Sequence, residues 1–200
     1  MDQSVLDSRR ERVAHAWGLS GNEVVLVSAG GLVGRPGGQD QCYPYRVHPH
    51  FRWLTGLSER DSVLAFDPQE GWTEFIPVPT PMDAVWEGRL PLGRGTDISE
   101  LDSWLEKRKD RTVLRLGYGE DQPEGERARA LEQRTLEARR PKDAQELALM
   151  RRAVAATAEG FAAARAASIA GVTERELQIA LITTTSSSET PKSANVSKHD

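Results

Sequence analysis

The stretch YPYRVHPHFRWLTG, residues 43–56, is the segment of this chain that most constrains its fold. Phe51 and Trp53 alternate with Arg52 along it, and a period of two is typical of a half-buried strand. We therefore expect Phe51–Leu54 to be extended, with the two aromatic rings in the core and Gly56 ending the segment. A second aromatic motif, WEGR, follows at residues 86–89.

Strands and helices alternate on both sides of this stretch. Before it, the pattern predicts a helix over residues 4–17 with Ser4 as its cap, a buried strand over 23–28 and a glycine-rich loop over 30–38. After it we expect a hairpin, a helix and a last strand, at residues 62–66, 73–78, 97–108 and 112–116. This order is typical of an α/β domain, which we assign to residues 1–125.

The composition changes near Glu124, where Ala, Arg and Glu become frequent. We expect a linker helix and connection over residues 126–142, followed by further helices over 143–181. Two capping-box pairs mark the starts of these later helices: Asp143 with Glu146, and Thr173 with Glu176. Residues 182–200 are rich in Ser and Thr and poor in apolar side chains, which predicts a disordered tail.

The composition excludes several classes of partner. Two hundred residues, 38 % hydrophobic and 28 % charged, suit a soluble globular chain of one domain and part of another. A net charge of −4 provides no basic excess, so we expect no nucleic acid partner. No apolar run approaches the ~20 residues that span a bilayer, so we expect no membrane partner. Cys42 is the single cysteine, which suits a reducing cytoplasm.

Three local patterns could carry chemistry, and each has a plainer interpretation. His48 and His50 could hold a metal, but no third ligand accompanies them and Pro49 favours an extended chain, so we expect surface histidines in a loop. Cys42 could be a nucleophile, but no base and orienting group form a triad with it. The glycines of residues 30–34 lack the spacing of a dinucleotide-binding loop, so we expect a flexible loop.

Several motifs, in order and spacing, resemble the amino-terminal domain of aminopeptidase P and prolidase, metallopeptidases related to creatinase. The first group comprises YPYR (43–46), Phe51 with LTG (54–56), SVL (62–64) and the Trp-x-Gly-Arg signature (86–89). A second group resembles the passage into the family's catalytic domain: Arg139, Lys142, Glu146, Leu149, Arg151 and Ala153. Residues 170–174 resemble a Pro-Gly-x-x-Glu turn, with alanine in place of proline.

The resemblance implies a two-domain plan. Residues 1–125 would form a creatinase-type mixed sheet flanked by helices, and residues 143–181 would open a pita-bread catalytic domain. The family holds two divalent metals, often manganese, with two Asp, one His and two Glu, all of them downstream of the Pro-Gly-x-x-Glu turn. We therefore expect this chain to bind no cofactor and to contain no catalytic residue of its own.

The WEGR motif supplies the only candidate site residues. In the family, the tryptophan of this signature can lie at the mouth of a neighbouring subunit's active site, so Trp86 could offer an apolar wall to a peptide. It could equally pack against the sheet of its own domain, with Gly88 needed for a turn. Arg89 would be either a cation on the substrate side or a member of an ion pair.

The function implied is that of an Xaa-Pro aminopeptidase- or dipeptidase-like protein, which hydrolyses peptide bonds before proline. As a fragment without the metal ligands, this chain is expected to be inactive alone. The alternative is a stand-alone module that dimerises, binds a full-length relative or binds peptides. The later helices would normally pack on a catalytic sheet that this chain lacks. Their apolar side chains would then be exposed, which invites association or instability: Leu147, Met150, Val154 and Phe161.

Overall fold

The computed structural model describes residues 2–38 and 40–189. The chain divides into two compact units, the first ending at Arg140 and the second beginning at Pro141. In the described part, the first unit contains a five-stranded sheet of order β4-β3-β2-β1-β5. The strands are β1 (Glu23–Ser28), β2 (Val63–Asp67), β3 (Gly71–Ile76), β4 (Thr96–Asp97) and β5 (Thr112–Leu116).

Strand β1 lies inside the sheet between partners of opposite direction. It pairs antiparallel with β2, so that Val25 lies opposite Phe66, and parallel with β5, so that Val25 also lies opposite Leu114. Strand β3 pairs antiparallel with β2 and parallel with the short β4. The sheet is therefore mixed, as predicted, and its four longer strands fall within two residues of their predicted positions.

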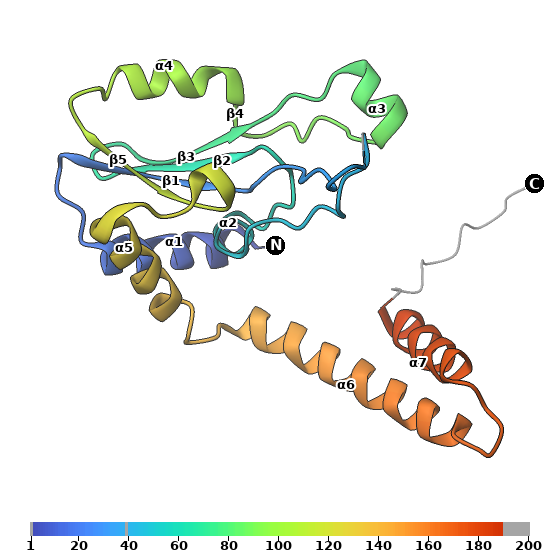
Figure 1. Ribbon diagram of the computed structural model, residues 1–200. Helices are drawn as coiled ribbons and strands as arrows, with labels where there is room; N and C mark the ends of the chain where they lie inside the picture. The colour runs from blue at the N-terminus through green and yellow to red at the C-terminus, as the bar shows by residue number, and fades with distance from the viewer. Residues whose placement is uncertain (1, 39, 190–200) are drawn as a thin grey trace, which may run out of the picture. The chain divides into compact units, whose positions relative to one another are not determined.

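Helices cover both faces of the sheet (Figure 1). On one face lie α1 (Gln3–Trp17), α2 (Pro49–Thr55) and α5 (Gly125–Ala138), and their apolar residues share a core with Val25 and Val27. On the other face lie the 3₁₀ turn η1 (Ile98–Glu100) and helix α4 (Leu101–Glu106), which pack around Leu26. Successive β1 side chains thus enter opposite cores, as the alternation of a strand requires.

Helix α2 corrects the prediction of an extended segment over Phe51–Leu54. Pro49 occupies the first helical turn, where its missing N–H costs nothing, and Gly56 ends the helix with φ +72°. A helix of seven residues is unstable alone, so burial decides its conformation. Phe51, Trp53 and Leu54 are all buried, so the expectation that these side chains lie in the core is confirmed.

The helix termini differ in detail from the prediction. Asp2, not Ser4, caps α1, because its carboxylate accepts the backbone N–H of Ser4 at 3.0 Å. The helix expected over residues 97–108 is split into η1 and α4, and the side chain of Asp97 caps η1 by accepting from Ser99 N at 2.9 Å. A short 3₁₀ turn, η2 (Gly119–Asp121), follows β5.

The second unit contains α6 (Ala144–Ala167) and α7 (Glu174–Glu189), which contact each other. The predicted capping boxes are both present: Asp143 with Glu146, and Thr173 with Glu176. Helix α7 runs eight residues past its predicted end at Leu181, into the segment predicted to be disordered. The rest of that predicted tail, residues 190–200, lies outside the described residues.

His48 and His50 are buried side chains, which corrects the expectation of surface histidines in a loop. His50 belongs to α2, and the two rings lie 5.0 Å apart, with Tyr118 4.4 Å from His48. Arg139 Nη1 lies 2.8 Å from His50 Nδ1, and the guanidinium can donate only if that nitrogen is unprotonated. Burial and the nearby Arg139 cation lower the pKa of His48 to about 4 and that of His50 to about 3.

A buried carboxylate joins the β2–β3 turn to the segment after α4. Asp67, with a fully buried side chain, accepts from Arg108 Nε and Arg111 Nη1, both at 2.7 Å, and from Gln69 N at 2.8 Å. Burial opposes its ionisation, but these hydrogen bonds hold the pKa of Asp67 below its usual value. Arg108, itself buried, also contacts the exposed Glu70.

Asp67→Ala should lower the free energy of unfolding by about 3–5 kcal/mol, because it removes the buried counter-charge of Arg108 and leaves that buried guanidinium with the exposed Glu70 as its acidic partner. Urea unfolding followed by tryptophan fluorescence measures this, since all five tryptophans lie in the first unit. Glu70→Ala is the matched control: its carboxylate is 65 % exposed, so the loss should be at most about 1 kcal/mol. Equal losses in the two variants would contradict this role of Asp67.

Stability should fall with acid because of the two buried histidines. Unfolded histidine titrates near pH ~6.5, so below that pH the unfolded chain binds protons that folded His48 and His50 do not. Each should therefore cost about 1.4 kcal/mol per pH unit as the pH falls from ~6.5 toward their lowered pKa values. Urea unfolding between pH 7 and 5 should show a shallower pH slope in His48→Phe than in the wild type, and equal slopes would contradict the prediction.

Candidate functional site

Between β3 and β4 the chain leaves the sheet in an arm, residues 77–95, that contains α3 (Pro81–Glu87) (Figure 1). The local sequence explains this helix. Thr80 Oγ1 accepts from Asp83 N at 3.2 Å and Asp83 Oδ2 accepts from Thr80 N at 2.7 Å, which forms a capping box. Pro81 suits the first turn, and Gly88, at φ +66°, ends the helix.

Helix α3 presents its large apolar side chains to solvent. Trp86 and Val85 are each 78 % exposed and Met82 is 63 % exposed, while the indole N–H of Trp86 donates to Met82 Sδ at 2.8 Å. The alternative in which Trp86 packs against its own sheet is therefore wrong. Adjacent apolar residues exposed on one short helix are typical of a binding surface.

Arg89 is engaged in an ion pair. Its Nε donates to Glu59 Oε1 at 2.7 Å, and a second guanidinium nitrogen contacts the same oxygen. Arg60, the neighbour of Glu59, donates to both oxygens of Glu87, at 2.9 and 2.7 Å. Of the two roles expected for Arg89, the structure shows the ion pair, which joins the arm to the turn after α2.

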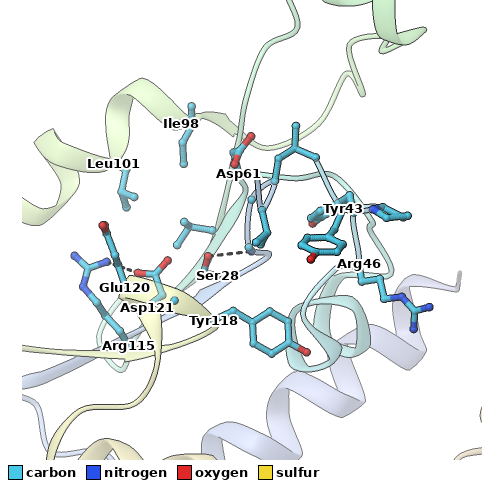
Figure 2. A pocket seen from close by; sticks show the side chains of 18 residues that line it. Ser28, Tyr43, Arg46, Asp61, Ile98, Leu101, Arg115, Tyr118, Glu120 and Asp121 are labelled. Atoms are coloured by element: carbon cyan, nitrogen blue, oxygen red, sulfur yellow. Dashed lines mark hydrogen bonds and ion pairs between the residues drawn. The ribbon is translucent and has the colours of Figure 1, made fainter. Parts of the chain in front are cut away.

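A cavity of about 780 Å³ lies beyond the carboxyl ends of the parallel strands β1 and β5. Crevices at this edge of a sheet are the usual ligand sites of α/β folds. In Figure 2, Tyr43 and Arg46 lie at one end of the cavity and Ile98 and Leu101 at the other. Local sequence patterns mark YPYR as a motif, but they do not indicate that it lines a cavity.

Several polar groups in this cavity already have internal partners. Tyr45 OH donates to Ala29 O at 3.1 Å, and burial, reinforced by nearby carboxylates, raises the pKa of Tyr45 to about 12. Arg115 pairs with Asp121 at 3.0 Å. None of the lining residues is a histidine or a cysteine. The cavity thus offers hydrogen-bonding and aromatic contacts, and not a nucleophile paired with a base.

The remaining sequence candidates form no reactive centre. Cys42 is half-buried, and its Sγ lies 3.9 Å from Asp40 O. The described residues bring together no group of three or more His, Cys, Asp or Glu side chains that could hold a metal ion. The family's two-metal chemistry therefore does not fit the side chains described. Nor does any described helix combine the length and apolarity needed to cross a membrane.

Comparison with solved structures supports the fold. A candidate aminopeptidase P from Bacillus anthracis superposes with a TM-score of 0.76 at 16 % identity, over 94 % of this chain and 52 % of its own. Pseudomonas aeruginosa aminopeptidase PepP gives 0.73 at 19 %, and Escherichia coli aminopeptidase P with the inhibitor Pro-Leu gives 0.71 at 20 %, each over 94 % of this chain and 50 % of its own. At these identities the likeness concerns the fold, and this chain spans about half the length of these proteins.

A comparison of the sequence with protein-family profiles identifies the family of the chain. No curated protein matches the chain. The profile of the family described as "Aminopeptidase P, N-terminal domain" matches residues 6–105, half of the chain, and includes the YPYR and WEGR motifs. The resemblance drawn from those motifs is confirmed, and the chain belongs to the aminopeptidase P family through its N-terminal domain.

Proposed function

We propose that this chain is the amino-terminal part of an Xaa-Pro aminopeptidase- or dipeptidase-like protein. The observation that carries the proposal is the match of the N-terminal domain profile over residues 6–105. The fold likeness to aminopeptidase P structures over 94 % of the chain supports it. The whole protein would act in the cytoplasm on peptides with proline after the scissile bond; the E. coli relative is solved with Pro-Leu as inhibitor.

The proposal assigns different roles to the parts of the chain. Residues 1–125 form the N-terminal domain, residues 126–142 the linker helix and connection, and residues 143–181 the first helices of a catalytic domain. The remainder of that domain would hold two divalent metal ions, which we expect to be manganese. Their chemistry would be to activate a water and polarise the scissile carbonyl.

Trp86 is the residue of this chain that we propose to approach substrate, at the mouth of a neighbouring subunit's active site. Its exposure and its place among the apolar residues of α3 support the role. An aromatic face next to a proline ring would give apolar contact and exclude water. Arg89 would serve the same mouth indirectly, since Glu59 neutralises its charge.

The alternative is a stand-alone module without catalysis that dimerises or binds peptides. The exposed apolar side chains favour it, both on α3 and on α6, where Val154 is 68 % exposed and Phe161 65 %. Surfaces of this kind are uncommon on isolated soluble proteins unless a partner covers them. Reading the coding DNA after codon 181 in all frames separates the two proposals: the first requires His-, Asp- and Glu-bearing family segments to follow.

The purified 200-residue chain should not hydrolyse Xaa-Pro-Xaa or Gly-Pro peptides, with or without added Mn²⁺. The reason is chemical: two-metal hydrolysis needs several converging carboxylates, and the described side chains provide no such group. Product release is measured by chromatography, with E. coli aminopeptidase P as the positive control. Turnover that disappears with a chelator would refute the prediction.

If the module proposal holds, the chain should self-associate through α3. Sedimentation equilibrium should then show a dimer whose Kd rises at least about tenfold in Trp86→Ser, because an aromatic anchor often dominates an interface. Leu136→Ser in α5 is the matched control, since it removes an exposed apolar side chain of the first unit that lies outside α3. A monomer at every concentration would exclude self-association as the module's function.

A further inference from the structure

Apolar packing does not hold helix α3 in place. None of its seven residues is buried. A cavity of about 330 Å³ lies where the end of the helix meets the turn after α2, lined by Tyr45, Ser58, Glu59, Arg60, Glu87 and Arg89. Close-packed side chains fix the position of most helices, and that constraint is missing here. Some other interaction must set the direction in which Trp86 projects.

The side chains around this cavity supply that interaction as two ion pairs. Consecutive residues of the turn, Glu59 and Arg60, bind Arg89 and Glu87 respectively. Gly88 separates the two arm residues, and its left-handed φ of +66° turns the chain between them. Most of these side chains are only 16–20 % exposed, and Glu87 is 35 % exposed, so solvent screens the pairs less than it screens a surface pair.

The opposite charges also fix the direction of the arm. Along the chain, the turn presents an acidic and then a basic side chain, and so does the arm. The acidic residue of the turn pairs with the basic residue of the arm, and the basic residue of the turn pairs with the acidic residue of the arm. Asp61 lies 3.4 Å from Arg60 and competes with Glu87 for its charge. Asp83, on α3 itself, is occupied by its bonds to Thr80. Each of the four charged side chains, two from the turn and two from the arm, therefore has an oppositely charged partner on the other segment.

We propose that Glu59 and Arg60 are positioning residues that hold α3 on the body of the first unit and thereby orient Trp86. The inference rests on the proposed function only in the purpose of Trp86; the ion pairs and the exposed arm stand without it. Because charge and not packing holds the arm, its opening equilibrium depends on ionic strength. At high salt α3 samples detached positions while the sheet remains intact.

Amide hydrogen exchange, resolved by peptide, tests this. In Glu59→Gln and in Arg60→Gln, exchange over residues 82–88 should accelerate at least about fivefold, while β1 amides stay protected. Wild-type protein in 1 M salt should respond in the same direction. Arg127→Gln, which breaks the Arg127–Glu23 pair far from the arm in sequence, is the matched control and should leave α3 exchange unchanged.

A charge swap separates positioning from a general loss of structure. The double variant Glu59→Arg with Arg89→Glu restores opposite charges, so α3 exchange should return toward wild type, whereas either change alone should raise it. The fluorescence anisotropy of Trp86 is obtained as the difference from the Trp86→Phe variant. It should fall in either single variant and recover in the double variant. Unchanged exchange and anisotropy in both Gln variants would overturn the proposal. Absence of peptidase activity in the whole protein would leave these measurements untouched and would count only against the proposed function.

Discussion

The pairing of β1 with β2 on one side and β5 on the other is the constraint on which the first unit depends. Residues Val24 to Val27 are buried, and their alternate side chains enter two different cores. Complete burial of an aliphatic side chain stabilises a fold by about 1.5–3 kcal/mol, so this strand anchors helices on both faces. Because β5 runs parallel to β1, the carboxyl ends of both strands meet at one edge, and the large cavity forms there.

The sequence predicted those elements whose local signals agree with one another. Strand β1 and the β2–β3 hairpin combine β-branched or aromatic residues with clear turn residues, and both are confirmed. Helix α2 was missed because Phe51, Leu54 and Thr55 also fit a helical spacing, so that the same residues satisfy two periods. The proline before them, which favours a first helical turn, was the signal that could have decided it.

Contacts between distant segments could not be predicted from local patterns. His48 and His50 are buried because Tyr118 and Arg139 lie against them, and nothing in their own neighbourhood indicates either partner. Arg89 and Glu59 are thirty residues apart, and the sequence left the role of Arg89 open between two alternatives. The candidate cavity likewise needs β1 and β5 side by side, although some eighty residues separate them in the chain.

The features that identify the family of this chain are different from the features that catalysis would require. Family membership rests on the profile match over residues 6–105, a range that contains four of the five strands and the YPYR and WEGR motifs. Activity would require metal ligands, and the described residues assemble no such group. What the first unit does offer is an exposed aromatic helix held by charge. Such a helix can be directed toward another surface without disturbing the core, because none of its side chains contributes to that core.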